Sequence, residues 1–590
     1  MKFFKLYSLA LAGALMLGAC SSSDDLKDGG ATANEGKSYI AVNIKSVGTA
    51  GAGTRAGDYT QGGATYEDGT ENEGAISKVR FFFFNSDGSP YIMKGTDKNY
   101  KELNSSVTGA TESDRLYTIE GKTAAMMVIK GETKTAPAYM IAVVNPQTLE
   151  KLEDKAYRES QLRDQFTDTK FIKIETAATG KKYSDFVMSN SVYSENGARV
   201  CASSVSGHVE ENQEEAEKNP VDIYVERVVA KATTTVNTAN WEQIADGTDA
   251  GKYKIKVGEI YINAENKKDV YAVVQGWGLA DENGQAELEK QIDVTNNNLT
   301  SAILGIEPWT TPDYHRCFWS ASVPFTVGTN QIVNHKFNEF TTPFGTTPLY
   351  TCPNTPTYEE FDTQKINEKP YENNLTKVLV AAKLVYYDDA NNSHPADICK
   401  YRGIQILGAD NVLKQVAKDH SEYWTVDPNN NSKHILLAYT DLEYTRTDLG
   451  DGSSTDKLKS YEVRPVLKAG VKVYKKNSDG TFETVDSNDE LNKLLAQSPV
   501  QVRKEGMTYY YTPIRHLAET KDKWGYYGVV RNHSYRITIN TMTGFGTPVY
   551  NPGEIIDPVI PKDTETYLAA RINVLSWRVV PSSVDLDATK

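Results

Sequence analysis

The sequence predicts a mainly β protein with few helices. Tyrosine is abundant, with 35 in a chain of 590 residues, and 10% of all residues are aromatic. Aromatic and β-branched residues are typical of strands because they fit a pleated, half-buried surface. Short apolar runs recur along the chain and end in turns rich in Gly, Asn and Asp, as Ala75–Phe84 does at Asn85–Gly88. The sequence has no regular alternation of strands with helices, the pattern that would indicate a parallel α/β fold.

Apolar runs of strand length follow one another along most of the chain. Hydrophobic residues make up 39% of the sequence, which can form the cores of about two to four domains. The expected strands are Ser38–Val47, Ala75–Phe84, Ala124–Ile129, Ala136–Val144, Asp185–Asn190, Val221–Lys231, Tyr253–Asn263, Val270–Gln275, Lys377–Tyr386, His434–Tyr439, Gly470–Lys475 and Ser534–Thr541.

Two segments have the pattern of helices. Pro146–Phe166 carries apolar residues at an approximate 3.6-residue spacing. In Ser487–Gln497, Ser487 can cap a helix and Glu490 stands at capping-box spacing. Residues 209–218 are strongly acidic, and we predict that they form a solvated surface loop.

The first residues have the features of a bacterial lipoprotein signal. Lys2 and Lys5 supply positive charge, and Leu6–Leu17 is an apolar run too short to span a bilayer. Small residues then precede Cys20, as in a lipobox, where the cysteine becomes the lipidated N-terminus. We therefore expect that residues 1–19 are a removable signal peptide, and that the chain is exported and first tethered to a membrane through Cys20.

One strand and one exposed loop follow this signal. Ile40, Val42 and Ile44 alternate with small or polar residues, which is the pattern of a half-buried strand. The glycine-rich loop that comes next contains a single basic residue, Arg55, followed by Ala56. Loops of this composition are readily cut by proteases, so Arg55 is either a target for a trypsin-like protease or an ordinary loop arginine.

The C-terminal segment, Tyr567–Lys590, carries a second isolated strand pattern. Four residues that alternate along it share one face of an extended strand: Leu568, Ala570, Ile572 and Val574. After Val574 the alternation of apolar residues shifts by one position, so that Trp577 falls on the other face. This shift suggests a bulge or two short strands in succession. Four prolines in residues 547–562 keep the preceding tether extended. Such a strand can fold back onto its own sheet or reach another molecule.

The two ends of the chain suggest one mechanism when they are considered together. Removal of the first strand by cleavage would open an apolar groove with unpaired backbone groups, and such a groove accepts a strand from elsewhere. The C-terminal strand of a second copy could fill it. Repeated head to tail, this contact does not close into a ring and builds a filament.

Several function classes have no support in the sequence. The net charge of −14 argues against nucleic-acid binding. The sequence contains no HExxH, P-loop or GxSxG motif, and its eight histidines have no metal-type spacing. We therefore predict no enzyme activity and no catalytic, cofactor or metal site. After Cys20 the cysteines are far apart, so disulfides of any of three connectivities and free thiols both remain open: Cys201, Cys317, Cys352 and Cys399.

Several stretches of the sequence together carry a resemblance to one known family. They are the lipobox at Cys20, Thr54–Asp58, Tyr224–Lys231, Gln275–Leu279, Tyr511–His516, Tyr527–Ile539 and Ile572–Val579. With these stretches the chain resembles the major fimbrilins of Bacteroidia type V pili, in the short-fimbria (Mfa-type) branch. Ser576 stands where the relatives carry a proline before the tryptophan.

The resemblance implies two transthyretin-like β-sandwich domains and a C-terminal donor-strand arm. On this basis we expect a propeptide at 20–55, an N-terminal domain at 56–235, a C-terminal domain at 236–546, and the tether and donor strand at 547–590. An arginine-specific protease would cut between Arg55 and Ala56. Identical subunits would then polymerise head to tail, together with accessory and anchor subunits, into an adhesive fimbria on the cell surface.

Two other functions stay open at the level of sequence. The chain could be an accessory or tip subunit of the same fimbria. It could also be a surface glycan-binding lipoprotein that is permanently anchored in the outer membrane through Cys20, in which case Arg55 stays uncut and the protein is monomeric.

Overall fold

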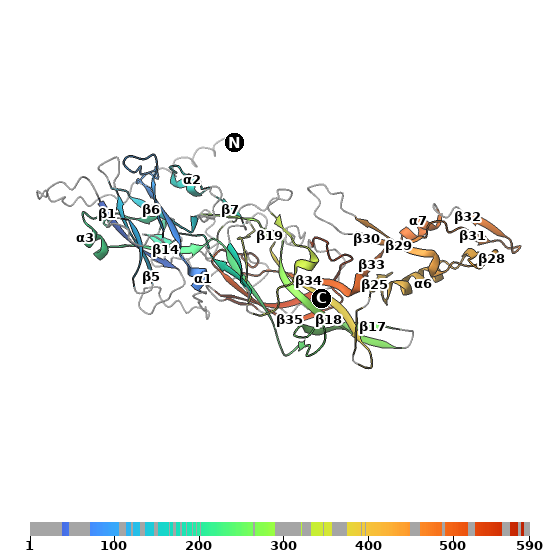
Figure 1. Ribbon diagram of the computed structural model, residues 1–590. Coiled ribbons are helices and arrows are strands. Elements are labelled where there is room, and N and C mark those ends of the chain that lie inside the picture. The colour runs from blue at the N-terminus through green and yellow to red at the C-terminus, as the bar shows by residue number, and fades with distance from the viewer. Residues whose placement is uncertain are drawn as a thin grey trace, which may run out of the picture. The chain divides into compact units, whose positions relative to one another are not determined.

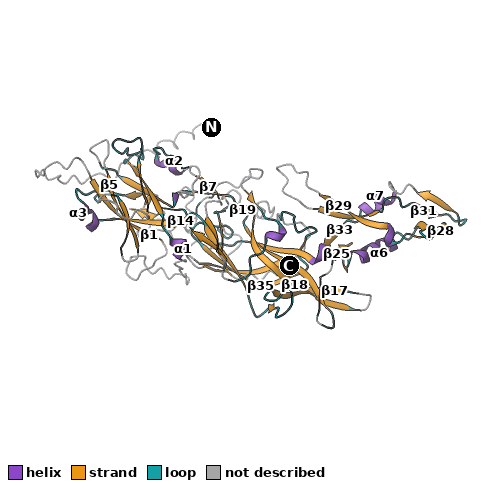
Figure 2. Cartoon of the chain, viewed as in Figure 1, coloured by secondary structure: helices purple, strands orange, loops and turns teal. Residues whose placement is uncertain are grey.

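In the computed structural model, all described residues belong to one unit, which begins at Ser38. Strands outnumber helices in the described part of the chain (Figures 1 and 2), which confirms the prediction of a mainly β protein. The structure describes residues 38–46, 71–104, 114–119, 122–129, 136–146, 152–163, 166–168, 173–177, 180–184, 186–190, 193–195, 198–200, 202–262, 266–288, 320, 322, 332–345, 347–356, 375–390, 392–395, 397–448, 461–485, 490–516, 525–556, 567–575 and 580–582.

The first sheet is built from the N-terminal part of the chain and contains the predicted first strand as an inner member. Its strands pair antiparallel except for the neighbours β14 and β1, which run parallel. In order across the sheet they are β3 (Tyr100–Asn104), β2 (Lys78–Phe84), β6 (Tyr139–Val144), β10 (Met188–Asn190), β14 (Val221–Arg227), β1 (Ser38–Ser46), β5 (Lys122–Ile129) and β4 (Arg115–Ile119), with β13 (Ser203–Ser204) beside β6.

This sheet curves around one apolar core. Phe81 on β2 belongs to the same buried cluster as Ile40 and Val42 on β1. The strands at the two ends of the order also approach each other, since the Nζ atom of Lys101 on β3 lies 2.8 Å from the Oδ2 atom of Asp114, just before β4. Removal of one strand from the curved sheet would therefore expose part of a core that its strands share.

A second and a third sheet face each other across the largest core. The second contains, in order, β22 (Leu349–Thr351), β15 (Ala230–Val236), β35 (Ser534–Thr543), β37 (Tyr567–Leu575) and β38 (Val580–Ser582). The third contains β16 (Glu242–Gln243), β17 (Tyr253–Tyr261), β18 (Lys267–Ala280), β23 (Lys377–Tyr387), β34 (Met507–Pro513) and β36 (Thr547–Pro548), with β24 (Ser393–Pro395) beside β23. Ile537 on β35 and Val380 on β23 lie in the buried cluster between them.

The Gly-Trp-Gly sequence of β18 has a packing reason. A Cβ atom at Gly276 would collide with the backbone carbonyl oxygen of Phe340, and one at Gly278 would lie 2.6 Å from the Phe340 ring. Trp277, between them, is fully buried on the opposite face, and its indole Nε1–H donates to the Pro343 carbonyl at 3.0 Å. The two glycines thus let the 332–345 segment lie directly on the sheet.

Residues 398–503 come after β23 and before β34 in the sequence, and these two strands pair with each other. Described residues of this range build a further buried core cluster. The helices α6 (Ala409–Asp419) and α7 (Glu490–Ala496) pack into this core, and α7 confirms the predicted helix Ser487–Gln497. One sheet contains β26 (Ile404–Leu407), β25 (Ile398–Tyr401), β33 (Val500–Arg503), β30 (Tyr461–Leu467) and β29 (Leu442–Asp448), and the other contains β28 (Asn430–Leu436), β27 (Tyr423–Asp427), β31 (Val473–Lys476) and β32 (Phe482–Val485). The division into domains at 235 and 546 stays a prediction.

The remaining described elements are short. Four two-stranded pairs are β11 (Tyr193–Glu195) with β12 (Ala198–Val200), β19 (Glu282–Asn283) with β21 (Ile332–Val333), β20 (Gln285–Glu287) with β7 (Phe166–Asp168), and β8 (Lys173–Ala177) with β9 (Gly180–Ser184). The other helices are α1 (Glu71–Gly74), α2 (Glu159–Arg163), α3 (Gln213–Lys218), η3 (Phe337–Glu339), η6 (Tyr439–Asp441) and η7 (Lys504–Gly506).

The predicted helix Pro146–Phe166 is wrong for most of its described length. Residues 152–158 are not helical, and only α2 adopts a helical turn. The Asn99 side chain explains this, because its Nδ2 donates to the Tyr157 carbonyl at 2.9 Å and its Oδ1 accepts from the Tyr157 N–H at 3.0 Å. Tyr157 also packs edge-on against Phe82 in a buried cluster, so tertiary contacts override the local helix pattern.

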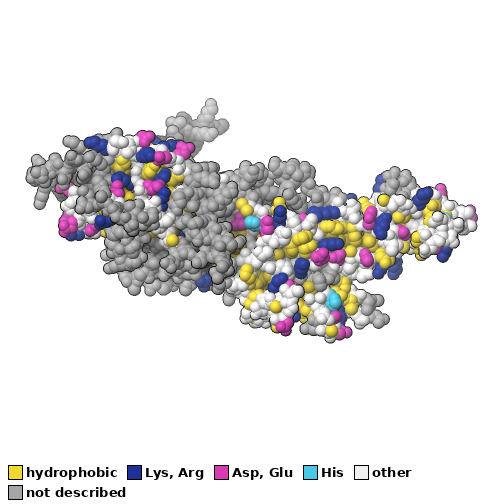
Figure 3. All heavy atoms as spheres, viewed as in Figure 1, with side chains coloured by type: hydrophobic (Ala, Val, Ile, Leu, Met, Phe, Trp, Pro, Cys, Tyr) yellow, Lys and Arg dark blue, Asp and Glu magenta, His cyan; other side chains and the backbone are white. Residues whose placement is uncertain are grey.

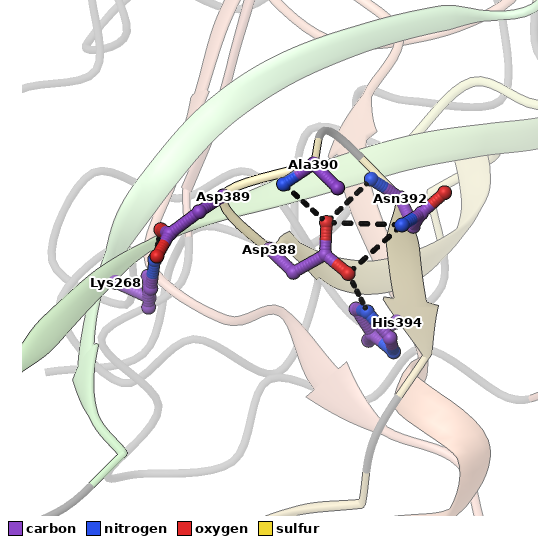
Figure 4. A network of polar contacts seen from close by, with 6 residues as sticks. All are labelled: Lys268, Asp388, Asp389, Ala390, Asn392 and His394. Atoms are coloured by element: carbon purple, nitrogen blue, oxygen red, sulfur yellow. Dashed lines mark hydrogen bonds and ion pairs between the residues drawn. The ribbon is translucent and has the colours of Figure 1, made fainter.

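A polar turn closes the hairpin between β23 and β24 (Figure 4). The Asp388 carboxylate accepts hydrogen bonds from the backbone N–H groups of Ala390 and Asn392 at 3.0 and 2.8 Å, and from the Asn392 side chain. The Nε2 atom of His394 lies 2.9 Å from the same carboxylate. Hydrogen bonds from Asn392 and His394 hold the pKa of Asp388 well below its ordinary value, so the charged form stabilises the turn.

We predict that Asp388→Asn loosens this hairpin at neutral pH. Because the folded-state pKa is lowered, the contribution of the carboxylate is complete above its ordinary pKa of 3.8 and is lost as the pH falls through the lower folded-state value. Hydrogen exchange of peptides that cover 385–395 should be faster in the variant at pH 7, and the difference from wild type should narrow in acid. Asp389→Asn is the control, since Asp389 is 97% exposed, and equal effects of the two substitutions would contradict the prediction.

Candidate functional site: strand β1 and its surroundings

β1 is paired along both edges. Alternation of apolar residues with small or polar ones makes the segment a strand, and its partners are β14 and β5. The parallel pairing runs from Val42 opposite Val221 to Ser46 opposite Val225. The antiparallel pairing runs from Ser38 opposite Ile129 to Asn43 opposite Ala124, so the strand β1 is a ladder partner of two neighbours at once.

The inner face of β1 forms part of the first core. Ile40 and Val42, two of the three residues predicted to anchor this strand, are fully buried in it. The side chain of the third, Ile44, lies outside the described residues, while its backbone stands opposite Ile223, which is itself fully buried. Full burial of an Ile or Val side chain contributes about 1.5–3 kcal/mol, so loss of the strand β1 would expose a substantial apolar groove.

The outer face of β1 is covered by the helix α3. Ala41, which is 1% exposed, packs in one small cluster with Met126 on β5 and Ala216 on α3. Residues 209–218 were expected to be a solvated loop, and that prediction is wrong for 213–218 because the Ala216 side chain gives this acidic helix one apolar contact with the sheet.

The helix α3 is held by groups that do not belong to β1. Its first turn is capped by Asn212, whose Oδ1 accepts from the Glu215 N–H at 2.9 Å. Glu217 accepts from the Nη2 atom of Arg115 on β4 at 2.8 Å. At its other end the chain enters β14 directly after Asn219, whose Nδ2 donates to the Gly207 carbonyl at 2.6 Å. The helix therefore spans β1 from anchors on both sides of that strand.

The predicted donor strand is β37, and it lies on the chain's own second sheet. It pairs antiparallel with β35, where Ile572 stands opposite Ile537 and Ala570 opposite Ile539. Val574 stands opposite Tyr535, and Leu568 opposite Met542, with a register shift between these two halves. A second short strand, β38, follows, which agrees with the predicted shift in alternation after Val574.

The first part of the predicted tether is anchored to the body of the chain. Val549 and Ile556 are buried in the cluster that contains Phe337. The backbone N–H of Phe337 donates to the Glu554 carbonyl at 2.9 Å, and that of Ile556 donates to the His335 carbonyl at 2.9 Å. The arm that leads to β37 thus starts from a fixed point at Ile556.

Other predicted site residues lie outside the described residues. These are Cys20, Arg55, Ala56 and Trp577, and for Leu568, Ala570, Ile572 and Val574 only the backbone is described. Among the cysteines, Cys352 and Cys399 are buried, whereas Cys201 and Cys317 are not described. Burial raises the pKa of the Cys399 thiol to about 12.

A buried ionic cluster fixes the chain just after the predicted cleavage loop. Glu73 on α1 is 1% exposed, and its Oε1 atom lies 2.8 Å from the Nζ atom of Lys231 and accepts from the Tyr350 hydroxyl. The Nε atom of Arg227 donates to the Glu73 backbone carbonyl at 2.6 Å, and burial lowers the pKa of Arg227 to about 10. Sequence reasoning missed Glu73, because it stands among other acidic residues, including Glu71 in the same four-residue helix, and nothing local distinguishes it.

The described surface offers no sign of a membrane span or a metal centre. Within the described ranges, no helix is long and apolar enough to cross a bilayer, and no group of His, Cys, Asp and Glu is placed to hold a metal ion. On the face drawn in Figure 3, basic and acidic side chains are interspersed, so the charge of this face is mixed in sign.

The C-terminal part of the chain matches a known protein family. Residues 502–582 match the model of "Major fimbrial subunit protein type IV, Fimbrillin, C-terminal". The matched region runs from β33 to β38 and contains both β35 and its partner β37. This match confirms the predicted relationship to fimbrilins.

Solved structures of similar size give only distant matches to the whole chain. A proposed cell adhesion protein of Parabacteroides distasonis is 11% identical, with 91% of this chain and 98% of that chain covered at a TM-score of 0.29. A fimbrial assembly protein of the same species is also 11% identical, with 76% and 100% covered at a TM-score of 0.24. The tip fimbrial protein Mfa3 of Porphyromonas gingivalis, truncated at its C-terminus, is 10% identical, with 91% and 99% covered at 0.26. Scores this low do not establish a shared fold, and a search of curated proteins finds no match to the chain.

We predict that Glu73→Gln destabilises the folded chain by about 3–5 kcal/mol, because it leaves the buried Lys231 ammonium without its carboxylate. The hydrogen bond from Arg227 to the Glu73 backbone carbonyl remains in the variant. The free energy of unfolding in urea is the measurement. Glu214→Gln is the matched control, since Glu214 on α3 is exposed and surface ion pairs such as the one it makes with Lys218 contribute little to stability. Equal stability of the two variants would contradict a structural role for the buried cluster.

Proposed function

We propose that this chain is a structural, non-enzymatic subunit of a cell-surface fimbria that polymerises by strand exchange and supports adhesion. The observation that carries the proposal is the position of β1, an inner strand with both edges paired and Ile40 and Val42 fully buried. A segment this deeply embedded leaves a defined groove when it is removed. The match of residues 502–582 to the fimbrillin family model supports a fimbrial role for the chain.

The first step is export and maturation. The chain travels to the outer membrane as a lipoprotein that is anchored through Cys20, and an arginine-specific protease cuts between Arg55 and Ala56. This cut separates β1 from the rest of the subunit, because β1 lies before the cleavage loop and all its ladder partners lie after it. The ionic cluster at Glu73 keeps the new N-terminal part attached to the body of the subunit.

The second step is exchange of a strand between copies. Departure of β1 leaves unpaired backbone groups on β14 and β5 and an uncovered part of the first core. The strand β37 of a second copy fills this groove, and its inward face consists of Leu568, Ala570, Ile572 and Val574. Trp577 follows after the shift in the alternation of apolar residues. Both β1 and β37 have nine residues, so their backbone ladders are of equal length.

The contact is heterologous, because one subunit offers its groove and the next offers its arm. Such a contact repeats without closure and builds a linear polymer of identical subunits. Accessory and anchor subunits bind at the two ends of this polymer, and the mature fimbria lies outside the cell.

We predict that Arg55→Ala leaves a lipidated monomer that does not polymerise, since β1 stays in its groove. Gel electrophoresis of surface material without boiling is the measurement, with a ladder of polymers expected for wild type and a single band for the variant. Arg55→Lys is the control, because it keeps the positive charge and still withholds the site from an arginine-specific protease. Abundant fibres from Arg55→Ala would overturn the proposed maturation.

Deletion of residues 568–590 is predicted to leave a chain that folds and matures but cannot donate a strand. Its groove still accepts an arm, so the deleted chain should cap growing polymers when it is expressed together with wild type. Electron microscopy should find no fibres from the deleted chain alone and shorter fibres from the mixture. Fibres of normal length from the deleted chain alone would contradict the role of β37.

A further inference from the structure

The helix α3 restricts which residue of a strand can lie beneath it. Ala41 is 1% exposed and Ala216 is fully buried, and the two side chains meet in one cluster with Met126. Because both alanines are buried in a cluster of only three residues, the space between strand and helix is small and a larger side chain is disfavoured there. The anchors of α3 at Arg115 and at the start of β14 remain when β1 leaves, so this steric limit passes to whichever strand comes next.

We propose that α3 sets the register of strand exchange, with Ala569 of a second copy taking the place of Ala41 beneath Ala216. This inference rests on the proposed function and deepens it. In this register Leu568 takes the place of Ile40 and Ala570 takes the place of Val42. Ala569 is the only small residue among the positions of β37 that alternate with the predicted inward face, the others being Tyr567, Arg571, Asn573 and Leu575.

The same alignment selects the direction of the incoming strand. Position 44 of β1 stands opposite Ile223, which is fully buried. The residue of an incoming strand that takes position 44 therefore lies beside an apolar core. A strand that runs in the direction of β1 brings Ile572 to this position. A reversed strand with Ala569 beneath α3 brings Thr566 there instead, and an unpaired hydroxyl is disfavoured beside a buried core.

A competing register follows from sequence likeness alone. Ile572-Asn573-Val574 resembles Val42-Asn43-Ile44, and their superposition shifts the strand by two residues. That shift puts Arg571 in the place of Ala41, directly against the buried Ala216. The arginine would have to displace α3 from its anchors, and we therefore reject this register.

Two adjacent alanines give a matched experiment. Ala569→Val adds two methyl groups beneath α3, and we expect fibre assembly to fall about ten- to hundredfold. Ala570→Val adds the same two groups in a place that Val42 has vacated, and we expect fibres about tenfold more resistant to dissociation. The full-length chain carries each substitution, the yield and detergent resistance of fibres are measured, and thermal unfolding of the monomers checks that both variants fold.

The outcomes separate this inference from the proposed function. Fibres that tolerate Ala569→Val and fail with Ala570→Val, or that respond equally to both, overturn the register while strand exchange stands. A wild-type chain that forms no polymer overturns the proposed function itself.

Engineered disulfides provide a second measurement. The full-length chain with Ala216→Cys and Ala569→Cys should give covalent ladders without reductant, whereas Ala216→Cys with Arg571→Cys should not. A pair at Ala41 and Ala216 in the uncleaved Arg55→Ala monomer calibrates the geometry and should close within one chain. Ladders from the Arg571 pair alone would establish the competing register and contradict the proposal.

Discussion

The paired position of β1 is the constraint on which the N-terminal sheet depends. Its backbone completes two ladders, its inner side chains fill a core shared by the whole curved sheet, and its outer face supports α3. A strand with these three attachments cannot leave without replacement, since exposed apolar area and unpaired sheet edges are both unfavourable. If β1 is removed as proposed, the sheet needs a strand from another molecule, and this need favours association.

The second sheet contains the complementary element. β37 pairs with β35 at a place where β35 already has β15 as its other neighbour. The arm that leads to β37 is fixed at Ile556, where Val549 and Ile556 are buried beside Phe337. The chain thus holds its proposed donor strand in its own second sheet, and the proposed exchange between copies would replace one set of ladder hydrogen bonds with another.

Sequence reasoning was most successful where the pattern depends on local alternation. Ile40 and Val42 in β1 and the short helix α7 follow from residue spacing, and the structure has both. It failed where a distant side chain decides the backbone: Asn99 prevents the helix predicted around Tyr157. It also missed α3, because this acidic segment becomes a structural element through the burial of Ala216 in one cluster with Ala41 and Met126. It missed the buried cluster at Glu73, because the partners of Glu73 are more than 150 residues away. Contacts of this kind leave no periodic trace in a sequence.

The mass of the subunit in purified fibres tests the central claim most directly. If the strand β1 is discarded during assembly, intact-mass measurement and N-terminal sequencing will find a chain that begins at Ala56, carries no lipid and lacks residues 38–46. A fibre subunit that begins at a lipidated Cys20 and retains β1 would contradict the account, because the groove for the incoming strand would then still be filled.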